Sequence, residues 1–292
     1  MKKIAVCVKR VLQTGEIAHF DQHGKLRTEG IRYETNRSDL HAVEEASRLL
    51  SRFGGEGILL TLGPEKTEAT LRECLAYGEF NAYRIDTLRK DPEDPTLIAR
   101  TLAQILQDLS PDIIFCGEVA SDDQFGQMGS RIAEHLGICA IGGVVHVTCM
   151  EGGNEIEVQR RLLRGAREVL RAPLPVVICV NPMINLLRYV NIPALFRAKR
   201  AKIEVIPDLF EQVKASTETY IRRIEIGPPR KRPKRIFVPD ASLSGSERLA
   251  QLLTGGMTKK GAKKDAIIES PPKEAAKEIY AFLKKEGFLE DS

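Results

Sequence analysis

The sequence predicts an α/β protein built on a mostly parallel, doubly wound sheet. In the first half of the chain, short apolar runs of strand length alternate four times with amphipathic segments of helix length. The connections between successive runs are too long for hairpins and have the length of crossovers. The runs are also apolar throughout, which is typical of strands covered by helices on both faces.

Short apolar runs mark the strands in order along the chain. Ile4–Val8 (IAVCV) opens the series and is closed by Lys9 and Arg10. Ala18–Thr28 contains a His-Gly turn and is expected to form a small hairpin or an ordered loop. Further parallel strands are expected at Gly57–Leu62, Ala82–Asp86, Asp112–Gly117 and Val176–Val180.

Amphipathic segments between these strands mark the helices. Asp39–Phe53 places Leu40 and Val43 near one face, with Ser38 as the expected N-cap and Gly54 after the end. Further helices are expected at Thr67–Tyr77, Thr96–Leu109 and Gly126–Leu136, because each amphipathic segment is followed by a glycine or a proline.

The pattern changes after Ile138, where polar and apolar residues begin to alternate. This alternation predicts antiparallel additions to the sheet. They are expected at Val144–Cys149, Ile156–Leu163 and Arg167–Arg171, with a turn at Glu151–Asn154. From Asn181 the periodicity fades, so residues 185–202 are expected to form a loop followed by a basic segment.

Composition divides the chain into an α/β domain, residues 1–228, and a C-terminal part, residues 229–292. The net charge is +4, but from Arg230 onward 14 Lys and Arg face 9 Asp and Glu. The sequence GPPRKRPKR predicts a basic linker. RNA is an alternative use of this cluster, but it lacks interleaved aromatic residues, so no nucleic acid is expected. Helices are expected at Ser244–Leu253 and Pro272–Glu286, and the second has an apolar face expected to pack on a partner subunit or on this chain.

Composition also indicates where in the cell the protein is located and whether it binds a metal. No apolar run approaches the roughly 20 residues that span a bilayer. The N-terminus lacks the features of a signal peptide, so we expect a cytoplasmic protein. The six cysteines form no CxxC pair, and the five histidines show no HExxH or HxH spacing. We interpret the cysteines as small buried hydrophobes, with metal or redox use as the alternative, and no metal site is predicted.

The loop Gly117–Gly129 (GEVASDDQFGQMG) is the strongest candidate for a binding site. In an open parallel sheet, ligands bind beyond the carboxyl ends of the strands, where the strand order reverses. This loop gathers a hydroxyl, carboxylates and an amide just before a helix N-terminus, whose free N–H groups suit a phosphate. A solvated polar loop is the alternative. Asp122 and Asp123 suit a helix cap, or else a metal or acid–base site. The absence of a GxSxG motif gives no support for hydrolytic catalysis.

Five segments in this order resemble the electron transfer flavoprotein beta subunit family. They are Ile4–Val11, the block from Asn36 to Ala46, Leu62–Pro64 with Thr70–Arg72, the loop Gly117–Gly129, and the run from Arg188 to Lys199. The likeness covers about residues 1 to 206 with collinear spacing. It implies an adenine nucleotide alpha hydrolase-like sheet and a heterodimer with an alpha subunit.

The resemblance also implies cofactors. FAD would be held mainly by the alpha subunit, while this chain would bind AMP, or a second FAD as in electron-bifurcating members. Those members carry an ATS-like run where this chain has bulky Ile98 and Arg100, which favours AMP. The nucleotide contacts carried over are Cys7, Asn36, Asp39, Leu62, Gly117, Ser121, Asp122, Gln127 and Gly129. Glu168 matches a glutamate that approaches the partner's flavin, and an exposed strand charge is the alternative interpretation.

Partners follow from the same resemblance. Electrons would pass from an acyl-CoA dehydrogenase-type flavoenzyme through the partner's FAD to a downstream oxidoreductase. Indirect membrane association would then be possible through this acceptor. The docking residues carried over are Ile192, Pro193, Ala198 and Lys199. Two other function classes stay open. An adenine-nucleotide hydrolase or ligase of similar architecture would use an SGGxDS loop where this chain has Lys9–Leu12, and a stress-type nucleotide sensor would be a colourless homodimer.

Overall fold

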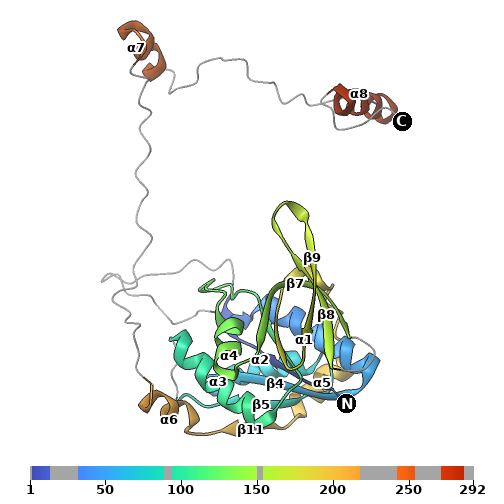
Figure 1. Ribbon diagram of the computed structural model, residues 1–292, viewed down its shortest axis with the longest axis vertical. Coiled ribbons are helices and arrows are strands. Elements are labelled where there is room, and N and C mark those ends of the chain that lie inside the picture. Colours follow the sequence, from blue (N-terminus) through green and yellow to red (C-terminus); the bar gives the residue numbers. More distant parts are fainter. Residues whose placement is uncertain are drawn as a thin grey trace. The chain divides into compact units, whose positions relative to one another are not determined.

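The computed structural model describes residues 2–13, 32–88, 94–149, 154–217, 242–253 and 271–285 (Figure 1). The expected hairpin at 18–28, the linker 227–235 and most of the turn at 151–154 lie outside these residues. The chain divides into two compact units, Met1–Pro228 and Pro229–Ser292.

The first unit contains a nine-stranded sheet with the order β11-β5-β4-β1-β6-β10-β7-β8-β9. Its strands are β1 (Lys2–Cys7), β4 (Gly55–Leu62), β5 (Asn81–Ile85), β6 (Ile113–Gly117), β7 (Cys139–Cys149), β8 (Glu155–Arg161), β9 (Arg167–Pro173), β10 (Val176–Val180) and β11 (Ile203–Ile206). Neighbours from β11 through β7 are parallel, whereas β8 pairs antiparallel with both β7 and β9. The predicted parallel sheet with antiparallel additions is therefore confirmed. A separate antiparallel pair joins β2 (Arg10–Leu12) to β3 (Tyr33–Thr35).

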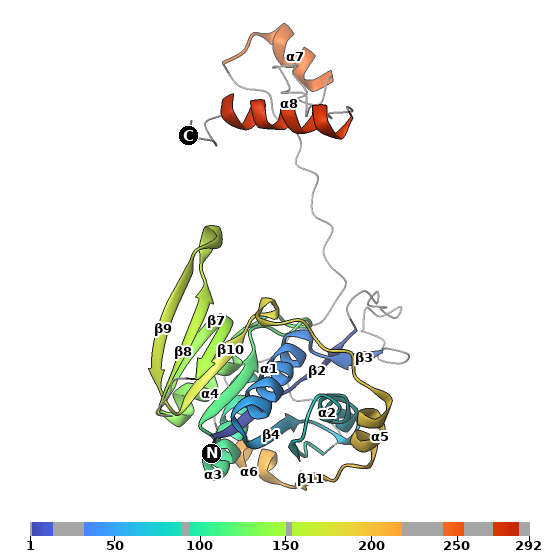
Figure 2. The same cartoon turned by 90° about the vertical axis from the view of Figure 1, so that its right-hand side faces the viewer.

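Helices cover both faces of this sheet (Figure 2). One face carries α1 (Arg37–Phe53), α2 (Glu68–Leu75) and α5 (Ile192–Arg200), and the other carries α3 (Pro95–Leu109), α4 (Met128–Leu136) and α6 (Leu209–Ala215). Successive residues of a strand point to opposite faces, so Ile4 and Val6 enter one core while Ala5 and Cys7 enter the other. This double burial explains why the strand is apolar at every position.

The strand order reverses between β1 and β6. The chain runs outward from β1 to β4 and β5, then returns through α3 to place β6 on the other side of β1. Both strands are parallel, so their carboxyl ends lie together at one edge. This edge is the topological switch point at which open α/β sheets bind ligands.

The N-terminus of α1 differs from the prediction. Its N-cap is Asn36, and Ser38 lies buried within the first turn. Ser38 was expected to cap because serine is a favoured N-cap residue. Sequence preference alone did not reveal that the chain turns into the helix two residues earlier.

The stretch 185–202 was predicted as a loop, and this is wrong for its second half. α5 starts with Pro193 near its N-terminus, and the side chain of Asn191 accepts a hydrogen bond from the Ala194 N–H at 2.9 Å. The Asn-x-Pro run is a valid helix-start signal. β11 and α6, which follow, were not predicted either.

The second unit contains α7 (Gly245–Leu253) and α8 (Pro272–Lys285), close to the two helices expected there. Apolar side chains of both are exposed, among them Leu249 and Phe282. In the part of the chain that the structure describes, no helix combines the length and the apolar character needed to cross a bilayer.

Candidate functional site

The buried side chain of Asp39 ties the two strand ends at the switch point together. Its Oδ2 atom accepts a hydrogen bond from the Lys9 N–H, just after β1, at 2.8 Å. Its Oδ1 atom accepts one from the Gly117 N–H, at the end of β6, at 3.0 Å. The side-chain amide of Asn36 donates to the same Oδ1 at 3.0 Å. One carboxyl group therefore fixes the spacing of β1 and β6 from the first turn of α1.

Burial raises the pKa of Asp39 to about 7, although its three hydrogen bonds oppose the shift. Removing a carboxylate from water disfavours its charged form, and donated hydrogen bonds favour that form. Here burial has the larger effect. Asp39 therefore titrates near neutral pH in the folded protein.

Asn36 and Lys9 bring the loop after β6 to the same place. The Asn36 amide donates to the carbonyl of Val119 at 3.1 Å and accepts from the Ser121 N–H at 3.3 Å. Lys9 Nζ lies 2.8 Å from Asp122 and 2.7 Å from Asp123. Burial alone would lower the pKa of Lys9, but these two carboxylates raise it above its usual value. We call Lys9, Asn36, Asp39, Gly117 and Ser121 the switch-point cluster.

Two features of the loop favour an anionic ligand. The Oγ atom of Ser121 is buried and has no hydrogen-bond partner among the described residues. No side chain caps α4 at Gln127, and the first turn of α4 contains no acidic residue. The free N–H groups and the positive end of the helix dipole are therefore available to a phosphate. An unpaired buried hydroxyl is unfavourable by itself, so a ligand oxygen is a fitting partner.

Two glycines allow the close packing around this cluster. A Cβ atom on Gly117 would collide with Oδ1 of Asp39 and crowd Ser38. A Cβ atom on Gly129 would collide with the Cys179 Sγ atom on β10. The first glycine lets β6 approach α1, and the second lets the N-terminal turn of α4 lie against the sheet.

Most residues carried over from the family resemblance lie at this edge of the sheet. Cys7, Asn36, Asp39, Gly117, Ser121 and Asp122 lie on or beside the switch-point cluster, and Gln127 and Gly129 start α4. Leu62 ends β4, the strand next to β1. The sequence analysis did not identify Lys9 as an ion-pair partner of the Asp122-Asp123 pair. Its place directly after the first strand was the available signal.

Cysteines lie in register beneath the cluster. Cys7 pairs with Cys116, and Cys116 with Cys179, on the adjacent strands β1, β6 and β10. The hydrogen bond with Cys7 and burial raise the pKa of the Cys116 thiol, and burial raises the pKa of Cys179 to about 11. The thiols of Cys116 and Cys179 are therefore protonated core groups at neutral pH. Cys139, on β7, is exposed. Within the described ranges, no group of three His, Cys, Asp or Glu is arranged to hold a metal ion.

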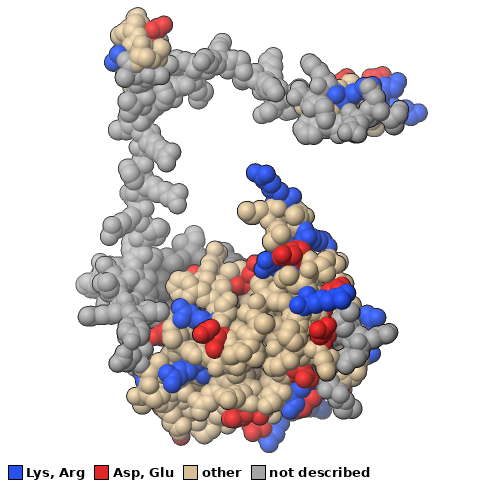
Figure 3. Space-filling model, viewed as in Figure 1, with Lys and Arg blue, Asp and Glu red and all other residues tan. Residues whose placement is uncertain are grey.

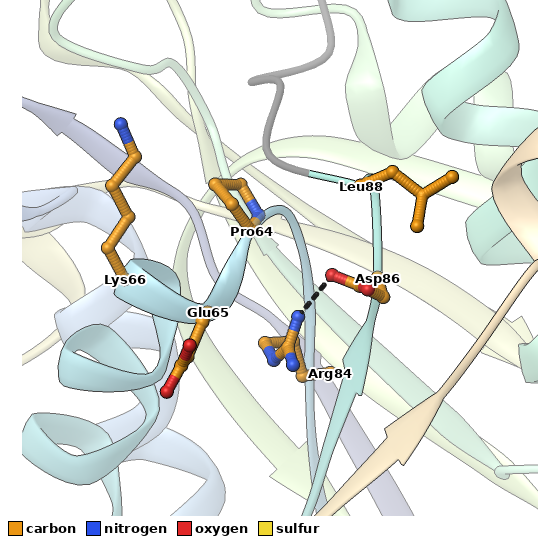
Figure 4. Close-up of a pocket in the computed structure, with 6 residues that line it drawn as sticks. All are labelled: Pro64, Glu65, Lys66, Arg84, Asp86 and Leu88. Carbon is orange, nitrogen blue, oxygen red and sulfur yellow. Dashed lines mark hydrogen bonds and ion pairs between the residues drawn. The ribbon is translucent and has the colours of Figure 1, made fainter.

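A cavity of about 420 Å³ lies at the ends of β4 and β5, farther along the same edge (Figure 4). It is lined by Pro64, Glu65, Lys66, Arg84, Asp86 and Leu88. The buried guanidinium of Arg84 donates to Asp86 at 2.6 Å, to Glu68 at 3.1 Å and to the Gly63 carbonyl at 3.1 Å. Protein groups already satisfy this charge, so the switch-point cluster remains the better candidate for an anion.

Glu168 lies elsewhere, on the edge strand β9. Glu168 lies opposite Arg160 of β8 in the strand register. The two side chains form an ion pair in which the distance from Arg160 Nε to Glu168 Oε2 is 2.5 Å. Basic side chains gather on this projecting hairpin (Figure 3). They are Arg160, Arg161, Arg164, Arg167 and Arg171. The Glu168 carboxylate is therefore a neutralised charge rather than a free one.

The proposed docking residues lie on an exposed apolar surface that runs from η3 (Pro182–Ile184) into α5. Tyr189 is fully exposed, Leu186 is 85% exposed and Ile192 is 68% exposed. Pro193 and Lys199 are exposed as well. Ala198 is buried in the core, so it does not contribute to this surface. Large exposed apolar patches on soluble proteins mark interaction sites.

Buried polar groups of α1 hold this surface in place. Glu44 is 1% exposed and accepts hydrogen bonds from Arg188 at 2.6 and 3.1 Å and from Arg48 at 2.6 Å. The Asn185 side-chain amide donates to Glu45 at 3.0 Å, and its oxygen accepts from Nδ1 of His41 at 2.9 Å. At the other end, Arg72 of α2 donates to three carbonyls at the end of α5: Ala198, Lys199 and Ala201.

Comparisons with known proteins identify the family to which this chain is similar. A family model described as the electron transfer flavoprotein domain matches residues 24–209. An electron transfer flavoprotein subunit beta from Thermoanaerobacterium thermosaccharolyticum is 31% identical over 209 residues, which are 70% of this chain and 79% of the relative. Protein FixA from Azotobacter vinelandii is 29% identical over 219 residues, or 73% of this chain and 76% of that protein.

One relative extends through the C-terminal unit as well. An electron transfer flavoprotein subunit beta from Clostridium acetobutylicum is 27% identical over 288 residues, covering 98% of this chain and 99% of its own length. The family model spans more than half of the chain and includes α1 and the loop after β6, which build most of the switch point. The chain therefore belongs to the electron transfer flavoprotein beta subunit family.

Proposed function

We propose that this chain binds AMP at the switch-point cluster and serves as the nucleotide-binding half of a heterodimeric electron carrier. The buried Ser121 Oγ atom, which has no partner among the described residues, carries the proposal together with the uncapped N-terminus of α4, which the same loop leads into. A phosphate oxygen would accept from the hydroxyl and from the first N–H groups of the helix. Cys7 and Leu62, at the ends of neighbouring strands, would offer apolar contacts to the adenosine part.

AMP is favoured over a second FAD by the first turns of α3. Ile98 packs against the core on that face, and Arg100 is exposed. Neither a branched apolar side chain nor a charged one resembles the small hydroxyl residues of bifurcating relatives. AMP has no redox chemistry, so its role would be to stabilise the folded chain by binding it.

The working flavin would belong to an alpha subunit. When bound, FAD supplies the one-electron and two-electron chemistry of the carrier, and this chain would contribute a wall beside it. Glu168, with its charge offset by Arg160, is the candidate for that wall. The exposed surface around Tyr189 and Ile192 would receive a dehydrogenase of the acyl-CoA dehydrogenase type. A downstream oxidoreductase would then accept the electrons.

Quantifying the small molecules released by heat from the purified heterodimer tests the cofactor proposal. We expect FAD and AMP in equal amounts. Twice as much FAD with no AMP would instead identify a bifurcating flavoprotein, and ATP turnover by this chain alone would support a nucleotide hydrolase. Ser121→Ala should lower the AMP content without changing the FAD content. Ser51→Ala, whose hydroxyl bonds within α1, is the matched control and should change neither.

A further inference from the structure

We infer that Arg131 is a positioning residue of the nucleotide site, because it fixes the amide of Gln127 as a hydrogen-bond donor toward a phosphate. This inference rests on the proposed binding of AMP. The resemblance carried over Gln127 but not Arg131.

The contacts of Arg131 join two helix N-termini. Its Nε and Nη2 atoms donate to Oε1 of Gln127, one turn earlier on α4, at 3.2 and 2.9 Å. Its Nη1 atom donates to Oγ1 of Thr96, in the first turn of α3, at 2.8 Å. The side chain of Gln127 is thereby held by two hydrogen bonds to a guanidinium that is itself anchored to a second helix.

The chemistry of the guanidinium decides which end of the amide it holds. Arginine has only donors, so the group facing it must be the amide oxygen of Gln127. The Nε2 group then points away from Arg131 as a donor, and it has no partner among the described side chains. A donor at the start of a helix suits an anion, whereas the amide oxygen turned the other way would repel a phosphate.

The charge of Arg131 points the same way. A cation near the positive end of a helix dipole is unfavourable unless an anion lies nearby. The first turn of α4 contains no acidic residue, and the neighbouring Asp122 and Asp123 are paired with Lys9. A bound phosphate would satisfy the helix end, the Gln127 amide and the Arg131 charge together.

Two nucleotide ligands, three variants of the full chain and one control variant test this inference. Dissociation constants for AMP and for adenosine are measured by calorimetry after removal of endogenous nucleotide. Arg131→Met should weaken AMP binding about tenfold, the effect of losing one hydrogen bond to a charged group. Gln127→Met should weaken it similarly, and the double variant no further, because both act through one amide. Adenosine has no phosphate, so its affinity should stay within twofold of the parent.

Arg52→Met is the matched control, since it makes the same substitution in the last turn of α1, outside the nucleotide site. It should bind AMP like the parent. Equal losses of AMP and adenosine affinity in Arg131→Met would show a merely structural role and overturn the inference. Unchanged AMP affinity in Arg131→Met or Gln127→Met would overturn it too. If the parent itself bound no AMP, the proposed function would fail first, and that result is distinct from the other two.

Discussion

Replacing Asp39 by asparagine should change how the stability of the protein depends on pH. Asparagine has nearly the same shape as aspartate but does not titrate near neutral pH. The variant therefore keeps the other ionisable groups and removes only the carboxyl group that joins β1 to β6. The difference in unfolding free energy between the parent and the variant then reports the ionisation of Asp39 alone.

The expected size follows from the raised pKa of Asp39, about 7 in the folded chain against an ordinary value of 3.8. Between these values the folded state holds a proton that the unfolded state has released. The parent should therefore lose stability relative to Asp39→Asn as pH rises from about 4 to about 7, by up to roughly 1.4 kcal/mol per pH unit. The full change is on the order of 4 kcal/mol, and above pH 7 the difference should level off.

Urea unfolding of both full-length proteins at half-unit pH steps measures this difference. Asp39→Ala adds a second comparison, because alanine leaves the N–H groups of Lys9 and Gly117 without an acceptor. It should be less stable than Asp39→Asn by about 1–3 kcal/mol at every pH. A constant difference between the parent and Asp39→Asn across pH 4–7, or one that favours the parent as pH rises, would refute the raised pKa. It would mean that the three donated hydrogen bonds outweigh burial.

Three further predictions concern packing and the exposed apolar surface. Gly129→Ala should destabilise the chain by about 1–3 kcal/mol, because its methyl group meets the Cys179 sulfur; thermal unfolding measures this, and Gly142→Ala, which meets no atom within 4 Å, should unfold like the parent. Arg72→Met should remove the hydrogen bonds that close α5 and speed amide hydrogen exchange at its C-terminus, and unchanged exchange there would contradict the capping role. Glu44→Gln should lower the unfolding free energy by about 2 kcal/mol, since a nearly fully buried carboxylate loses its ion pairs with two half-exposed arginines. Urea titration measures this loss. A loss below about 0.5 kcal/mol, the size of an ordinary surface change, would show that water replaces the ion pairs.

Helix α1 contributes to both candidate surfaces, the switch-point cluster and the exposed apolar surface before α5. Its N-terminal turn supplies Asp39 to the switch point, and the next two turns supply Glu44 and Glu45 to the segment that precedes α5. These polar side chains are buried, although most charged residues lie on protein surfaces. The burial of these charged side chains is therefore explained by the segments that they hydrogen-bond, the switch point and the stretch before α5, rather than by the helix itself.

The strands and long helices were predictable because their signals are local. A strand covered on both faces must be apolar at each position, as Ile113–Gly117 is, and a helix with a long apolar stripe ends where a glycine follows. α5 escaped prediction because its buried residues are the small Ala194 and Ala198, while larger Leu195 and Phe196 are exposed. Its apolar pattern therefore does not mark a core-facing stripe.

The sequence by itself determined most of the sheet, the order of its long helices and the candidate ligand-binding loop, since each depends on residues close together in the chain. Only the tertiary structure showed that Asp39 binds the N–H of Gly117, 78 positions away, that Arg160 neutralises Glu168, and that Ala198 is buried. Such pairings depend on which strands become neighbours and in what register. The chain topology decides this through the burial of the whole sheet, and no short window of residues contains that information.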